Sequence, residues 1–200
     1  MKNELPINTM QDLVTAGELI SQTMMAGAGN PAEGFIIAAH CFQHGISWLD
    51  FADSFNVVKG RVSMRADAMA ANFGAAGGVV EVIQRDSHRC ELKLSMKGRD
   101  SAVFQCQWEG ELELEPFVKG KGGKGLKQKY ETPRSRMQMM HARVISDALR
   151  AYYPEANKGK YTPEEVEDFD DAPSAAVATV SVEDLTAAAE PVAATVPDEF

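Results

Sequence analysis

Residues 117–153, FVKGKGGKGLKQKYETPRSRMQMMHARVISDALRAYY, are the stretch from which the structure can be inferred most directly. Residues 133–153 predict a long helix, because Thr132 can cap its free amides and Pro133 suits its first position. Pro154 ends it, since the residue before a proline is biased towards extended backbone. Apolar side chains recur at three- and four-residue steps and predict one buried stripe: Met137, Met140, Val144, Ile145, Ala148, Leu149 and Tyr152.

Arginines accompany this stripe. Arg136, Arg143 and Arg150 are seven residues apart, so they line up along the helix, and Arg134 and His141, also seven apart, form a second such pair. The preceding loop, residues 119–129, holds five lysines and four glycines. Guanidinium groups bind phosphate oxygens in pairs, and lysines on a glycine-rich loop can follow an irregular strand. This combination indicates binding to a nucleic-acid backbone.

The charge of the chain is distributed unevenly. The formal net charge is −9, but nine of the 29 acidic residues lie after residue 166, where there is no lysine or arginine. Residues 1–166 therefore carry twenty acids and twenty bases, and residues 119–160 carry eleven bases against three acids. A neutral body with a basic segment and an acidic tail is typical of a polyanion-binding protein.

Composition narrows the class further. Of the 200 residues, 44% are hydrophobic, which is enough for a core, and the apolar runs are too short to cross a membrane. The first residues lack the apolar region of a signal peptide. Cys41, Cys90 and Cys106 are odd in number and widely spread, which favours reduced thiols in a cytosol. We therefore expect a cytoplasmic protein.

The remaining pattern predicts an α+β fold. Its expected elements are helices over 9–25 and 31–44, a β-hairpin of 55–58 and 61–64, a short helix over 65–73, and an antiparallel meander between 79 and 114. Lys59-Gly60 is the hairpin turn. In the helix over 31–44 we expect four residues to face inward: Phe35, Ile36, Ala39 and Phe42. Leu112 and Leu114 alternate with glutamates, which indicates an exposed edge strand.

Three parts of the chain are expected. Residues 1–30 form an N-terminal helix or arm, residues 31–168 form the nucleic-acid-binding core, and residues 169–200 form a disordered acidic tail, because they combine acids with alanine, valine and proline and contain no large apolar cluster.

The glycines of the basic loop suggest a different phosphate-binding motif. Gly120 and Gly125 have the separation of a phosphate-binding P-loop, but Leu126 and Lys127 stand where that motif requires Lys and Ser or Thr, which excludes it.

His40 and His44 lie one helical turn apart, as in a zinc-binding helix. Cys41 stands where the metalloprotease motif has glutamate, and no second ligand pair has a standard spacing, so packing is the preferred interpretation and no metal is expected.

Aromatic and acidic side chains allow further interpretations. Tyr130 and Trp108 could stack on bases, and Tyr130 is the better candidate because Trp108 alternates with core residues. One face of an expected strand carries Glu111, Glu113 and Glu115, which could hold Mg²⁺ in a nuclease. A polar strand face is the preferred interpretation.

Four segments together resemble the RecT-type phage recombinases, which are single-strand annealing proteins. Residues 58–69, VKGRVSMRADAM, resemble the family's hydrophobic-x-Gly-x-Pro-x-Leu-x-Ala-Asp pattern, with Val62 in place of proline. A Lys/Gly loop precedes a long helix, and PRSRMQMMHARVISDALR over 133–150 is similar to the family helix. Tyr153-Pro154 followed by GKYTPEEV over 159–166 is similar to the family's ending.

One departure concerns the loop. Family loops often carry a tryptophan just after the glycines, where this chain has Leu126 and Gln128, so Tyr130 is left as the substitute for base stacking.

The resemblance implies an α+β core, homo-oligomeric rings or helical filaments, and ATP-independent annealing of complementary strands in a bacterial host. It implies a phage or prophage origin and a partner exonuclease, and we also expect a single-stranded-DNA-binding protein as partner. No cofactor is expected, and because no bond is made or broken, neither is enzymatic catalysis. The expected DNA-binding residues are Lys119, Lys121, Lys124, Lys127, Lys129, Tyr130, Arg134, Arg136, Arg143 and Arg150, with Arg61 and Arg65 extending the groove.

A second hypothesis stays open. The basic helix could bind an acidic partner in a structural or scaffolding phage protein, and that partner could be the chain's own acidic tail.

Overall fold

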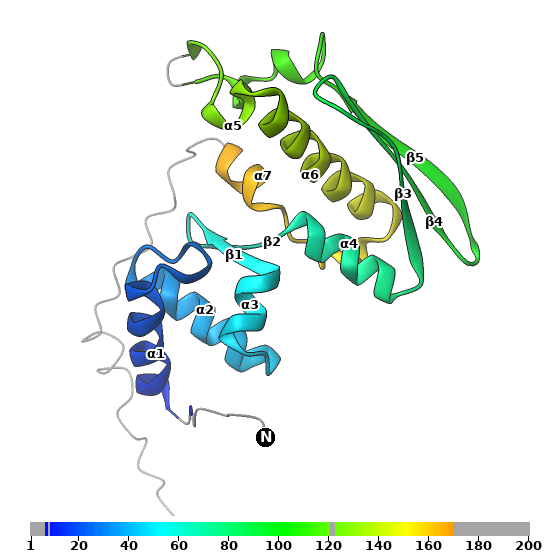
Figure 1. Cartoon of the computed structure of the whole chain (residues 1–200). Coiled ribbons are helices and arrows are strands. Elements are labelled where there is room, and N and C mark those ends of the chain that lie inside the picture. The colour runs from blue at the N-terminus through cyan, green and yellow to red at the C-terminus, as the bar shows by residue number, and fades with distance from the viewer. Residues whose placement is uncertain (1–6, 8, 121–122, 170–200) are drawn as a thin grey trace, which may run out of the picture. The chain divides into compact units, whose positions relative to one another are not determined.

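The computed structural model describes residue 7, residues 9–120 and residues 123–169, and it has the expected mixed α+β fold (Figure 1). The tail expected over 170–200 and Lys121 of the basic loop lie outside the described residues. The elements in chain order are α1 (Met10–Gln22), η1 (Met25–Gly27), α2 (Pro31–His44), α3 (Trp48–Ser54), β1 (Phe55–Val58), β2 (Arg61–Met64), α4 (Ala66–Ala75), β3 (Gly78–Arg85), β4 (Arg89–Met96), β5 (Arg99–Gln107), η2 (Leu112–Leu114), η3 (Pro116–Val118), α5 (Gln128–Glu131), α6 (Pro133–Tyr152), η5 (Pro154–Ala156) and α7 (Pro163–Asp168).

Helices α1 and α2 cross at two glycines. A Cβ atom on Gly34 would lie 1.9 Å from the carbonyl oxygen of Gly17, so any side chain there would force the helices apart. This close crossing turns the small-residue face of α2 inward, so the expected inward face was wrong, and Phe42 is 58% exposed. The residues of α2 that are buried are Gly34, Ile37, Ala38 and Cys41.

Helices α1 and α2 belong to one hydrophobic cluster that continues into α3 and the hairpin. It includes Ile20 of α1, Ile37 of α2, Phe51 of α3 and Val57 of β1. The boundary expected between residues 30 and 31 therefore falls inside a shared core.

The β1–β2 hairpin has the expected register, with Phe55 opposite Met64 and Val58 opposite Arg61. Its two turn residues, Lys59 and Gly60, have φ angles of +50° and +71°. Positive φ at both positions gives a turn whose twist matches the twist of the strands, and the glycine makes it accessible at low cost.

Strands β3, β4 and β5 form the expected antiparallel meander in the order β3-β4-β5. Cys90, Leu92 and Leu94 of β4 alternate inward and are fully buried, because one face of the sheet is covered. Helix α6 lies along this face, with α4 beside it (Figure 1). Cys90 lies directly opposite Cys106 of β5, and both are free thiols.

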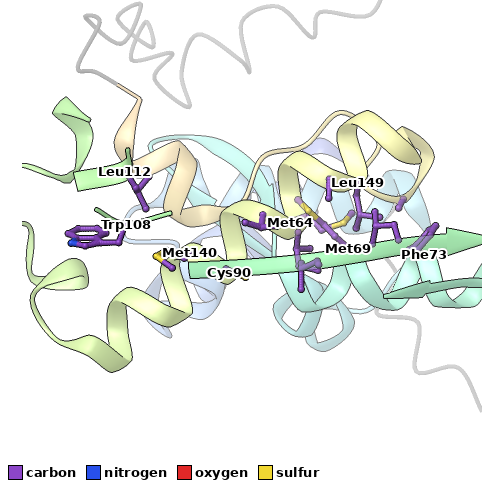
Figure 2. Close-up of a cluster of buried hydrophobic side chains, with 14 of the residues drawn as sticks. Met64, Met69, Phe73, Cys90, Trp108, Leu112, Met140 and Leu149 are labelled. Atoms are coloured by element: carbon purple, nitrogen blue, oxygen red, sulfur yellow. The ribbon is translucent and has the colours of Figure 1, made fainter. Parts of the chain in front are cut away.

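Helix α6 is the central element of this second cluster. The Thr132 hydroxyl caps it by accepting the backbone N–H of Ser135 at 3.1 Å, as expected. The buried side of α6 packs on β4 and α4, and Figure 2 shows Met140 and Leu149 among side chains from these elements. The stripe predicted from spacing is confirmed at Met140, Val144, Ile145, Ala148 and Leu149. No helix of the described residues, α6 included, combines the length and apolarity needed to cross a bilayer.

Residues 112–114 do not form the expected edge strand but the 3₁₀ turn η2. The Glu111 carboxylate accepts the N–H of Gln107, and the Glu113 carboxylate accepts the N–H of Gly110. These local side-chain bonds favour a turn over a strand. Leu112 is consequently buried, while Leu114 of the same turn is 67% exposed.

Candidate nucleic-acid interface

The basic loop is closed at its base by backbone contacts. An isolated β-bridge joins Lys119 to Leu126, and the N–H of Lys127 donates to the carbonyl of Val118 at 2.9 Å. Gly120 is required here, because a Cβ atom on it would lie 2.5 Å from a backbone oxygen of the loop. The loop therefore begins and ends at one point, directly before α5 and α6.

Three of the expected cations at the loop end of α6 are open. The side chains of Lys119, Lys124 and Arg134 form no ion pair or hydrogen bond with any other described residue. Lys124 and Arg134 are exposed, and Lys119 is half-buried. Figure 1 shows the loop, α5 and the first turn of α6 at the same end of α6. These three residues are called the open cations below.

Tyr130 is fully buried, so the expected exposed stacking residue is part of the core. Its ring stacks on Trp108 with centroids 5.9 Å apart. The guanidinium of Arg136 lies over the Trp108 ring, 4.2 Å from its centroid. Trp108 itself is buried, as expected, and the aromatic pair supports the start of α6 instead of facing solvent.

Three cations converge on the carboxylate of Asp168, whose side chain is 3% exposed. Lys127 Nζ and Lys129 Nζ lie 2.7 and 3.1 Å from Oδ1, and the Arg143 guanidinium is ion-paired with Oδ2. The Tyr130 hydroxyl accepts from Arg143 at 3.1 Å and donates to Asp168 at 3.3 Å. Burial raises the pKa of Tyr130 above its usual value, so the hydroxyl keeps the proton that it donates. This group is called the Asp168 cluster below.

Further contacts hold the cations of this cluster. Arg143 lies over the ring of Phe117, 3.9 Å from its centroid, so the ring covers one face of the guanidinium. Lys129 also contacts Glu167, with 3.0 Å between Nζ and Oε2, and donates to the carbonyl of Glu164. The side chains of Lys129 and Arg143 are therefore only 18% and 13% exposed.

Arg150 is bound to a second carboxylate of α7. Its Nη2 lies 2.6 Å from Oε1 of Glu165, which is buried. Ser146 donates to the same carboxylate at 2.7 Å, and the backbone N–H of Thr162 donates to it at 2.8 Å. Burial by itself would raise the pKa of Glu165, but the hydrogen bonds and the charge of Arg150 outweigh burial and lower it. Asp147 is the exposed partner of Arg150.

The two hairpin arginines also have partners. Arg65 forms a two-pronged pair with Asp67, with donor–acceptor distances of 3.2 and 3.1 Å. Arg61 lies 5.9 Å from the ring centroid of Phe169, at the end of α7. Arg65 is therefore paired with a carboxylate, whereas the side chain of Arg61 forms no ion pair or hydrogen bond with another described residue and lies against the end of α7.

The residues that sequence reasoning missed are the acids of α7. Thr162 and Glu165 form a capping box, a pattern that marks a helix start. Glu165 and Asp168 are three residues apart and therefore lie on one face of that short helix. The pattern could have predicted the helix, but its docking on α6 depends on the tertiary fold.

The alternative sites receive no support from the geometry. Within residues 7, 9–120 and 123–169, no three His, Cys, Asp or Glu side chains are grouped closely enough to hold a metal ion. Two of the glutamates considered for a nuclease accept backbone N–H groups around η2. His40 packs edge-on against Phe51, and burial, with the charges of His44, Lys160 and Lys158, lowers its pKa to about 4.

Comparison with protein-family models, with curated proteins and with solved structures finds no significant match for this chain. The residues and their contacts are therefore the basis for any functional argument. They divide the basic segment into the open cations at the loop end and the cations bound to α7.

Proposed function

We propose that this protein binds single-stranded DNA and promotes the annealing of complementary strands without a nucleotide cofactor. The observation that carries the proposal is the set of open cations, Lys119, Lys124 and Arg134, at one end of α6. They belong to residues 119–136, which hold seven bases and one acid. The proposal places the protein in a bacterial cytoplasm, encoded by a phage or prophage. No bond is made or broken, so it is not an enzyme.

Phosphate contacts dominate the proposed binding. The aromatic residues of segment 117–136 are Phe117 and Tyr130. Phe117 is half-buried under Arg143, and Tyr130 is fully buried, so neither offers an open ring face to a base. A strand held mainly through its phosphates keeps its bases free to pair, which is what annealing requires. Such binding is insensitive to sequence and strongly dependent on salt.

Self-association is a further part of the proposal. One copy offers only a short cationic patch, whereas a ring or helical filament places many such patches along one strand. Electron microscopy with and without complementary oligonucleotides tests this point directly, and particles that remain single copies under annealing conditions contradict it.

The test of DNA binding uses a triple charge reversal at the open cations. K119E/K124E/R134E is compared with R85E/K97E/K158E, which changes the net charge by the same amount at exposed cations elsewhere. We expect fluorescence anisotropy of a labelled oligonucleotide to show weak binding only for the first variant. Its log–log salt slope should shrink by about 0.7 per lost phosphate contact. Annealing of two dye-labelled complementary strands should fall in parallel. Equal affinity of the two variants overturns the proposal.

A second candidate function rests on a different observation. Helix α6 already binds an acidic segment, because Asp168 and Glu165 of α7 contact Arg143 and Arg150. This favours a scaffolding protein whose basic surface binds an acidic protein partner. A gel shift at low salt separates the two candidates, since only the first binds an oligonucleotide that lacks any protein.

A further inference from the structure

The Asp168 cluster has the composition of an anion site that the chain occupies by itself. Lys127, Lys129 and Arg143 all contact a single carboxylate, and Glu167 supplies one more acid at its edge. Three cations against two carboxylates leave an excess of positive charge. A phosphodiester carries the same single charge as the Asp168 carboxylate and offers comparable acceptor oxygens to lysine and arginine donors.

The two ends of α7 are held differently. At its start, the carbonyl of Tyr161 accepts the N–H of Met64, and the buried Glu165 binds Ser146 and Arg150. At its end, the N–H of Phe169 donates to the carbonyl of Glu165, and the Asp168 carboxylate contributes ion pairs. Lys59 of the hairpin turn donates to the carbonyls of Glu167 and Phe169 at 3.2 and 3.3 Å, so the hairpin also contacts this end. The bonds of Asp168 to Arg143 and Tyr130 are made by its side chain alone, so they can be exchanged while Glu165 keeps the start of the helix in place.

The Asp168 cluster adjoins the open cations. Lys127 follows the Lys119–Leu126 bridge directly, and its backbone N–H is bonded to Val118. The side chain of Lys127 is 35% exposed, more than that of Lys129 or Arg143. A strand that lies on Lys119 and continues towards α6 therefore meets Lys127 first.

From this arrangement we infer that the end of α7 is an internal competitor of DNA phosphate. When a strand is held by the open cations, a phosphodiester takes the place of the Asp168 carboxylate among Lys127, Lys129 and Arg143. This inference rests on the proposed DNA binding and adds its regulation. The bound cations then form a second, concealed part of the interface that opens only for a polyanion.

Effective concentration explains why a polyanion is needed. The Asp168 carboxylate is tethered, so its local concentration is high and a free phosphate ion competes poorly with it. A phosphodiester next to one already held at Lys119 is tethered as well, and the two competitors become comparable. Removal of the Asp168 charge should therefore strengthen DNA binding.

The test compares Asp168→Asn with Glu91→Gln. Both substitutions remove one negative charge and one arginine partner, and Glu91 pairs with Arg89 of β4, outside the Asp168 cluster. We expect D168N to bind a labelled oligonucleotide about tenfold more tightly than wild type at low salt. E91Q should stay within about twofold of wild type. In a D168N/K127Q variant the gain should disappear. Equal affinities of D168N and E91Q overturn the inference.

A second measurement uses the wild-type chain and so does not depend on a variant folding. With a saturating oligonucleotide, hydrogen exchange at the amide of Phe169 should accelerate, because the end of α7 is displaced. The amide of Met64, bonded to the carbonyl of Tyr161, should stay protected and serves as the internal control. Unchanged or slower exchange at Phe169 contradicts the inference.

The outcomes separate this inference from the proposed function. If wild type binds DNA but D168N matches E91Q, only the internal competition is wrong. If D168N binds and wild type does not, the competition is supported in its strongest form. If neither binds, the proposed function fails, and the inference fails with it.

Discussion

The two parts of the basic segment contain the same kinds of residue in different environments. At the loop end, Lys119, Lys124 and Arg134 have no partner among the described residues. Farther along α6, Arg143 and Arg150 are ion-paired with Asp168 and Glu165 of α7. The first group can contact a ligand without changing the fold, whereas the second group already stabilises it.

This difference shows that position on a helix does not decide what an arginine does. The seven-residue spacing correctly predicted that Arg136, Arg143 and Arg150 lie beside the buried stripe, and all three are half-buried. Being beside the core also makes these side chains accessible to the next element that packs there. That element is α7, which brings two buried or nearly buried carboxylates.

The largest effect on stability is expected at Glu165. Glu165→Gln leaves the partly buried Arg150 without its buried charged partner, which should lower the free energy of unfolding by about 3–5 kcal/mol. Asp147→Asn is the matched control, because it removes the exposed partner of the same arginine and should cost less than about 0.5 kcal/mol. Urea unfolding of both variants measures the difference. Equal costs would show that the buried Glu165 pair stabilises the fold no more than an exposed ion pair does.

The same carboxylate predicts a pH dependence. The pKa of Glu165 is lowered in the folded protein, so its stabilising contribution is present above the unfolded pKa, about 4.3, and is lost as the pH falls through the lower folded value. The stability difference between wild type and E165Q should therefore be constant near neutral pH and shrink in acid. His40 titrates in both proteins alike and cancels in the comparison. A difference independent of pH contradicts the prediction.

The smallest of these effects is expected at Tyr130. Tyr130→Phe removes the hydroxyl that joins Arg143 to Asp168, which should cost about 1–2 kcal/mol of unfolding free energy. Affinity for single-stranded DNA should not fall, because the ring is buried and does not stack on bases, and because the lost hydrogen bond weakens the hold on the competing Asp168 carboxylate. Anisotropy titrations on the folded variant measure this. Lost affinity without lost stability would restore Tyr130 as a DNA contact.

Sequence reasoning succeeded where the structure depends on neighbouring residues. The hairpin at Lys59-Gly60, the cap at Thr132 and the stripe from Met140 to Leu149 all follow from local turn chemistry and from periodicity. It failed where a contact between distant residues decided the outcome. Helices α1 and α2 cross at Gly17 and Gly34, because backbones can approach this closely only at glycine. The buried residues of α2 are therefore each one position away from those expected.

The candidate site divides in the same way. Its cations and their spacing follow from the sequence alone, because charge and helical period are local properties. Which of those cations remain open was decided by the tertiary fold, because Asp168 lies 25 residues beyond Arg143 along the chain, and pairing the two requires the intervening chain to fold back. Ion pairing depends on distance in space, and a sequence specifies that distance only through the whole fold.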